Sequence, residues 1–195
     1  ALSVIPKPFQ SPHPPLWQVI DSAPSIEFAA RNGLQGMFWI PPTDAMVSRF
    51  ELYSETASQA QGQDVPMGEG VTLVRDMFVT ETMAQAEELA GQAFLRYMEW
   101  VCHFRGLSNH RYPGEELPET PGKLDLLSYQ WLHPRNMLFG TADYVAEKIH
   151  EMKEKLNLQS LLVWSNFPGL DHRTVMDSVH RFTEEVMPQF SEETN

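Results

Sequence analysis

Hydrophobic and polar residues alternate along the chain in blocks that have the lengths of strands and helices. Short apolar runs predict strands at 16–20, 34–40, 71–79 and 160–164. Between and after them, apolar residues recur every three to four positions, which predicts helices at 24–32, 43–61, 80–104, 142–156 and 172–187. Thr43 or Asp44, the run 80–82 and Thr141 are the expected caps of the second, third and fourth of these helices. Because a strand and a helix follow each other four times, the pattern favours parallel strands joined by right-handed crossovers.

The first strand passes into the first helix through a polar turn that contains Asp21, Ser22 and Ser25. Asp and Ser are common helix caps, and Gly33 is a typical left-handed stop after the helix. The first amides of a helix have no partner inside it and lie at the positive end of its dipole. The turn is therefore a candidate anion site, most often for phosphate. A plain capping role for Ser22 and Ser25 is the alternative that the residues alone leave open.

The length of the chain points to part of a larger fold. A complete (β/α)₈ barrel takes about 250 residues, whereas this sequence has 195. We expect residues 1–195 to form a single partial α/β domain, the carboxyl-terminal half of a (β/α)₈ TIM barrel with about four parallel strands and a loop insertion at 106–135. A small open, doubly wound sheet fits the same alternation of elements. In a barrel the working face lies at the carboxyl ends of the strands. Trp39 and Trp164 both lie at such strand ends, and of the two we expect the Trp164 side chain to pack in the core.

Composition narrows the function classes. The net charge of −12 disfavours a nucleic-acid partner, and the longest apolar runs are shorter than a membrane span requires. The single cysteine, Cys102, excludes an internal disulfide framework and favours a cytoplasmic protein. None of the seven histidines has a partner at metal-ligand spacing, so no metal site is expected.

Four motifs in order resemble one family. The Pro-rich motif at 6–15 with the strand and helix behind it resembles the second half of the bacterial luciferase-like flavin-dependent monooxygenases. The motif Gly-Thr-Ala-Asp-x-Val at 140–145 resembles the start of a helix in that family. The segments 161–169 and 185–188 resemble its last strand and terminal helix.

The resemblance implies a luciferase-like barrel that uses reduced FMN and O₂ to oxidise a small organic substrate, aldehyde- or ketone-like. It implies Asp21, Ser22, Ser25 and Trp39 as cofactor-binding residues, a flavin reductase as the source of reduced flavin, and a homo- or heterodimer for the intact enzyme. The family's catalytic histidine and its phosphate-binding arginine belong to the amino-terminal half, so no catalytic residue is expected in this segment, which alone would be inactive. A non-catalytic flavin-binding partner subunit and a deazaflavin-dependent oxidoreductase are the alternatives.

Overall fold

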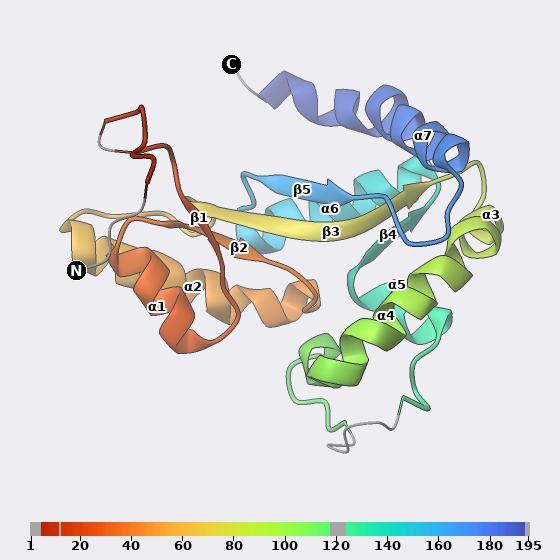
Figure 1. Cartoon of the computed structure of the whole chain (residues 1–195), viewed down its shortest axis with the longest axis horizontal. Helices are drawn as coiled ribbons and strands as arrows, with labels where there is room; N and C mark the ends of the chain where they lie inside the picture. Colours follow the sequence, from red (N-terminus) through yellow and green to blue (C-terminus); the bar gives the residue numbers. More distant parts are fainter. Residues whose placement is uncertain (1–4, 12, 118–123, 194–195) are drawn as a thin grey trace.

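Five parallel strands form one sheet in the computed structural model (Figure 1). The structure describes residues 5–11, 13–117 and 124–193. The strands are β1 (Trp17–Val19), β2 (Gln35–Phe38), β3 (Val71–Val79), β4 (Met137–Gly140) and β5 (Leu161–Trp164). The predicted parallel α/β architecture is confirmed, since every strand pair in the sheet is parallel.

The helices lie close to the predicted ranges, except for α5, which was not predicted and lies mostly in the segment expected to be a loop. They are α1 (Ala23–Arg31), α2 (Thr43–Gln61), α3 (Met83–Ala86), α4 (Gln92–Arg105), α5 (Tyr129–Asn136), α6 (Ala142–Leu156) and α7 (His172–Arg181), with the π turns η1 (Glu87–Gly91) and η3 (Phe182–Val186) and the 3₁₀ turns η2 (Ser108–His110) and η4 (Met187–Glu193). The predicted cap of helix α2 is wrong. Its N-cap is Pro42, and neither Thr43 nor Asp44 caps it. Thr82 and Thr141 do cap their helices, each by accepting an amide hydrogen bond.

The four predicted strands lie in sequence order, as β1, β2, β3 and β5. Alternate residues of a parallel strand bond to opposite neighbours. The Gly70 carbonyl accepts from β2 and the Thr80 amide donates to β4, whereas the Leu73 amide donates to the residue before β5. Strands β2 and β4 therefore share one edge of the long strand β3, and β5 occupies the other edge.

Strand β4 was not predicted, because its four residues directly follow a segment rich in Pro, Gly and Glu. It lies beside the carboxyl-terminal end of β3, from Asp76 to Val79. The predicted loop insertion at 106–135 contains the short turn η2 and most of α5, and its residues 118–123 lie outside the described ranges. Whether this segment is an insertion stays a prediction.

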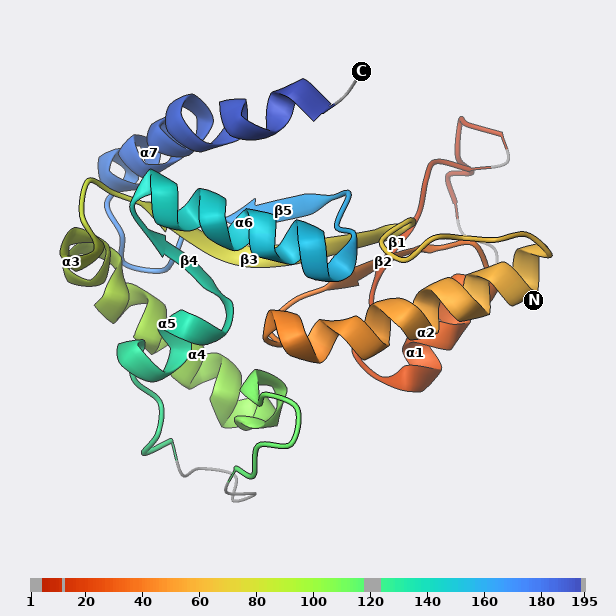
Figure 2. The same cartoon turned by 180° about the vertical axis from the view of Figure 1, so that it is seen from behind.

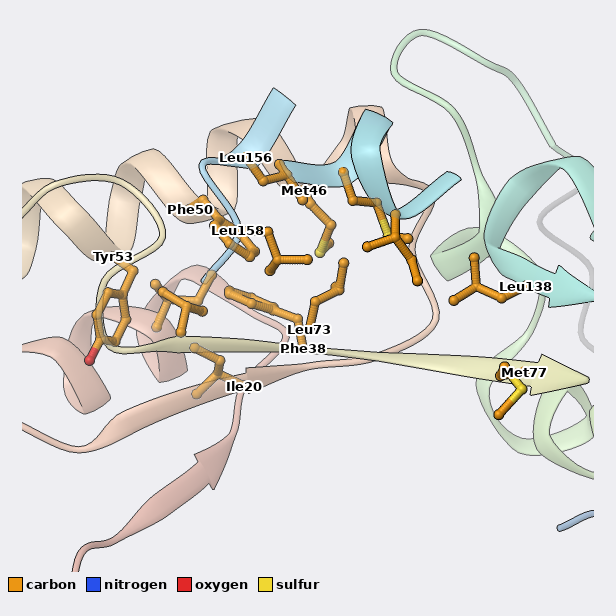
Figure 3. Packing of buried hydrophobic residues seen from close by; sticks show 14 of the residues in the cluster. Ile20, Phe38, Met46, Phe50, Tyr53, Leu73, Met77, Leu138, Leu156 and Leu158 are labelled. Atoms are coloured by element: carbon orange, nitrogen blue, oxygen red, sulfur yellow. The ribbon is translucent and has the colours of Figure 1, made fainter. Parts of the chain in front are cut away.

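The main hydrophobic core lies between the sheet and the helices α1, α2 and α6 (Figure 3). Phe38 of β2 and Leu73 of β3 point at Phe50 of α2 in that view, and the Phe38 and Phe50 rings stack with centroids 5.5 Å apart. Figure 2 shows α2 and α6 on the same side of the sheet. These helices fix the position of the strand ends, and thereby of the loops that follow them.

A second core covers the other side of the sheet at its carboxyl-terminal end. It joins Phe78 of β3 and Phe139 of β4 to Phe94 of α4 and to α5. The rest of this face keeps large apolar side chains exposed on the outer strands β1 and β5: Trp17, Val19, Leu162 and Trp164. The second core thus covers this face of the sheet only at its carboxyl-terminal end.

Candidate functional site

The β1–α1 turn brings three of the predicted site residues together. Ser22 is the N-cap residue of α1, and its carbonyl accepts from the amides of Ser25 and Ile26 at 3.0 Å each. The Ser25 hydroxyl accepts from the Asp21 amide at 3.2 Å and donates to the Ser22 carbonyl at 2.8 Å. The Ser22 hydroxyl makes no capping bond and donates only to the Ser25 hydroxyl, at 3.3 Å. Ser25 therefore holds the turn together, whereas the Ser22 hydroxyl has to give up only its bond to Ser25 in order to donate to a ligand.

The turn offers fewer amides than an ideal anion cradle. Pro24 has no N–H, and the Ser25 amide already bonds to the Ser22 carbonyl. Among the hydrogen bonds of the described residues, the amides of Ser22 and Ala23 have no acceptor. Two amides and one hydroxyl at the start of α1 thus remain for an anion.

A cation from α2 lies beside the turn. Arg49 Nη2 is 3.7 Å from Asp21 Oδ1, and Asn109 donates to Asp21 Oδ2 at 3.3 Å. Arg49 Nη1 is buried and has no hydrogen-bond partner in the described part of the chain. Burial lowers the pKa of Arg49, an effect that Asp21 opposes. A guanidinium with unused hydrogen-bonding capacity therefore lies next to the predicted phosphate turn.

Arg49 also lines a cavity of about 510 Å³. One wall of this cavity is formed by Pro41 in the β2–α2 connection and by Ala45 and Ser48 in the first two turns of α2. The other wall is the segment after α4, which contributes Asn109 and a second cation, Arg111. Because Asp21 contacts both Arg49 and Asn109, the cavity adjoins the turn.

Trp39 lies in a different cluster at the end of β2. Its indole stacks on Trp164 of β5 with centroids 6.3 Å apart and an angle of 18° between the rings. Tyr97 of α4 lies 6.1 Å from Trp39 and 6.4 Å from Trp164. Trp164, expected in the core, is instead 46 % exposed. Three aromatic rings from two strand ends and one helix form this cluster, which can wall a planar ligand.

Asp76 of β3 gives the aromatic cluster a titratable group. Its Oδ2 accepts from Trp39 Nε1 at 3.2 Å, whereas its Oδ1 is buried without a hydrogen-bond partner in the described structure. Burial raises the pKa of Asp76 to about 7, against the opposing effects of the Trp39 hydrogen bond and the Arg75 charge. Near neutral pH this carboxyl group can therefore hold or release a proton.

Sequence reasoning found the turn but missed Arg49, Asn109 and Asp76. No contact among the described residues joins Trp39 to the turn, so the predicted set divides into two places. Asp76 could have been noticed as a charged residue inside an apolar strand. Arg49 gave no local signal, because its position depends on how α2 packs beside α1.

Within the described ranges, no group of three or more His, Cys, Asp or Glu side chains could hold a metal ion. None of the helices formed by these residues is both long and apolar enough to cross a membrane.

Comparisons with known proteins support the fold. No protein-family model matches the sequence, and neither does any curated protein. Among solved structures, a monooxygenase from Streptomyces bottropensis is 21 % identical with a TM-score of 0.71, over 96 % of this chain and 51 % of its own. The oxygenating constituent of 3,6-diketocamphane monooxygenase from Pseudomonas putida, a type II Baeyer–Villiger enzyme in complex with FMN, is 22 % identical with a TM-score of 0.71, over 91 % and 49 %.

A coenzyme F420-dependent tetrahydromethanopterin reductase from Methanopyrus kandleri is also similar, with 13 % identity, a TM-score of 0.62, and coverage of 93 % of this chain and 52 % of that one. The resemblance to luciferase-like flavin monooxygenases is confirmed for the fold. The chain spans about half the length of these structures.

Proposed function

We propose that this chain is the part of a flavin-dependent monooxygenase that binds the phosphate end of the flavin. The observation that carries the proposal is Arg49, whose guanidinium lies beside the β1–α1 turn and lines the adjoining cavity of about 510 Å³. Helix N-termini and arginine are the usual protein partners of phosphate. The turn's free amides, the Ser22 hydroxyl and Arg49 together fit such a group.

Each residue of the turn has a separate task in this proposal. Ser22 donates its hydroxyl to a phosphate oxygen, and Arg49 supplies the positive charge. Asp21 holds Arg49 in position through its carboxylate, and a bound phosphate competes with that carboxylate for the guanidinium. Ser25 keeps the turn in shape through its hydrogen bonds to the Asp21 amide and the Ser22 carbonyl.

The aromatic cluster is proposed to wall the pocket for the flavin ring and the substrate. Trp39 and Trp164 present nearly parallel rings at the carboxyl ends of their strands. The flavin, when bound, supplies the redox and oxygen chemistry, and the protein orients it and excludes water. Asp76 orients the Trp39 indole by accepting its hydrogen bond.

For the intact enzyme we propose reduced FMN and O₂ as co-reactants, an aldehyde- or ketone-like organic substrate, a flavin reductase as the source of reduced flavin, and a dimeric assembly. The FMN-bound Baeyer–Villiger monooxygenase among the similar structures supports this choice. The similar F420-dependent reductase favours a deazaflavin as the second candidate. Titration of the chain with each cofactor separates the two. A non-catalytic partner subunit of the same fold would bind FMN without supporting oxidation.

The two serines of the turn are expected to respond differently to removal of their hydroxyls. Ser25→Ala breaks three hydrogen bonds within the turn and should lower the free energy of unfolding by about 1 kcal/mol. Ser22→Ala should leave the melting temperature almost unchanged and weaken FMN binding about tenfold or more, because it removes a hydrogen bond to a charged acceptor. Thermal melting and FMN titration of both variants check this. Equal melting losses with unchanged FMN affinity would make both serines structural.

Arg49→Gln is expected to weaken FMN binding by about ten- to a hundredfold while leaving riboflavin binding unchanged. Riboflavin lacks the phosphate, so the ratio of the two dissociation constants isolates the contact to that group. Arg31→Gln on α1 is the matched control, since it also removes one arginine from an ion pair, Arg31–Glu27. A loss of FMN and riboflavin affinity by the same factor would contradict a phosphate contact.

A further inference from the structure

A second cavity lies at the start of α2, beside α5 and α6, and residues of all three helices line it; Figure 2 shows where the three helices lie. Its volume is about 250 Å³, the size of a small ligand. It is lined by three cations from three different elements, Arg75 of β3, Arg135 of α5 and Lys148 of α6. None of the three belongs to the turn or to the aromatic cluster described above.

Arg75 is a buried cation that forms no direct ion pair within the described residues. Its side chain is part of a residue only 1 % exposed, and no carboxylate of the described residues lies within ion-pair distance of it. Its guanidinium donates to the Val74 carbonyl at 3.1 Å and to the Pro41 carbonyl at 2.8 Å. The carboxylate of the next residue, Asp76, bonds to Trp39 instead. The Asp76 charge partly offsets the effect of burial on the pKa of Arg75, but no carboxylate of the described residues forms a direct ion pair with this guanidinium, as buried charges in proteins usually do.

The acidic side chains that line the cavity already have partners. Glu151 accepts from Lys148 at 2.8 Å and from Lys155 at 2.9 Å. Asp44 accepts from Lys155 at 2.6 Å. These carboxylates therefore pair with the two lysines, and neither of them pairs with Arg75.

Two further groups at this cavity lack hydrogen-bond partners. Arg135 pairs with Glu115 and lies over the Trp131 ring, 4.0 Å from its centroid, yet its Nε has no acceptor. Asn136 donates to the Ile40 carbonyl at 2.6 Å, which fixes the orientation of its amide and leaves Oδ1 without a donor. Both side chains are more than nine-tenths buried. Within the described structure, the residues that line this cavity thus include one unused donor and one unused acceptor.

We propose that this cavity binds a small oxyanion, a phosphate or carboxylate group, that compensates Arg75. Arg135 and Lys148 donate charge-assisted hydrogen bonds to it. A hydroxyl on the ligand satisfies Asn136 Oδ1, so an anion that carries a proton binds better than one that has none. The site lies apart from the flavin phosphate turn, and the inference does not rest on the proposed function.

The test follows the melting temperature of the full chain at pH 7 in sodium phosphate, sodium sulfate and sodium malonate, against sodium chloride at equal ionic strength. A ligand that binds only the folded state raises the melting temperature saturably. We expect phosphate to do so more strongly than sulfate, because sulfate has no proton to donate to Asn136. Malonate reports whether a carboxylate serves as well as a phosphate. No difference from chloride for any of the three anions overturns the proposal.

Variants locate the effect. Lys148→Gln should shift the half-saturating phosphate concentration upward by about tenfold, since it removes a charge-assisted donor. Lys153→Gln is the matched control on the same helix, because Lys153 lies over the Phe190 ring, 5.5 Å from its centroid, and does not line this cavity. Ser22→Ala tests the other anion site in the same assay. A phosphate response that is lost in Ser22→Ala and kept in Lys148→Gln assigns the anion to the turn and refutes this cavity as its site.

Discussion

Replacing Asp76 with asparagine is expected to remove a large pH dependence of stability. Burial raises the pKa of Asp76 to about 7, whereas an unfolded aspartate titrates near 3.9. The folded chain thus binds more protons than the unfolded chain between about pH 4 and 7, so the free energy of unfolding of the wild type falls as pH rises through this window. Asparagine keeps an acceptor for the Trp39 indole and does not titrate.

The measurement is urea denaturation of wild type and Asp76→Asn at pH 4 to 8. One pKa unit corresponds to about 1.4 kcal/mol. From pH 4 to pH 8 the free energy of unfolding of the variant should therefore rise by up to about 4 kcal/mol relative to that of the wild type, and the difference should stay constant above pH 8. Asp177→Asn, an exposed aspartate on α7, is the control and should follow the wild-type profile. Parallel profiles for wild type and Asp76→Asn would show that the buried carboxyl group titrates normally.

The fold could be predicted from sequence largely because its signals are local. The apolar runs of β1, β2, β3 and β5 and the periodicity of the intervening helices are each visible within one element. Strand β4 was missed because it is a strand only through its pairing with β3, and its own four residues do not indicate one. The Pro42 cap was missed because Thr and Asp are the more common cap residues. In the structure, Pro42 has the extended backbone of an N-cap, and Thr43 is already the first residue of the helix.

The candidate site could be predicted only where its residues are neighbours in sequence. Asp21, Ser22 and Ser25 lie in one turn, and the structure brings them into contact. Arg49 reaches them from another helix, and Asn109 from a segment 88 residues further along the chain. Asp76 and Trp39, which are 37 positions apart in sequence, meet because β2 and β3 are adjacent strands. Such pairings depend on packing, which a single sequence does not display.

Phe94→Ala is expected to be the most destabilising substitution near the aromatic cluster. Phe94 is fully buried in α4, and its ring centroid lies 5.1 Å from that of Phe139 in β4 and 5.2 Å from that of Phe167 after β5. Truncation leaves a cavity where three elements meet, so the free energy of unfolding should fall by about 3–5 kcal/mol. Urea denaturation measures this loss.

Phe104→Ala provides the matched control, because Phe104 lies on the same helix and is 70 % exposed. Its removal should change the free energy of unfolding by less than about 0.5 kcal/mol. Tyr97, three residues after Phe94, packs on Trp39 and Trp164, so loss of the Phe94 contacts should also weaken the near-ultraviolet circular dichroism of these rings. A loss of stability no larger than that of Phe104→Ala would mean that α4 is not anchored through Phe94, and that the aromatic cluster is held by β2 and β5 alone.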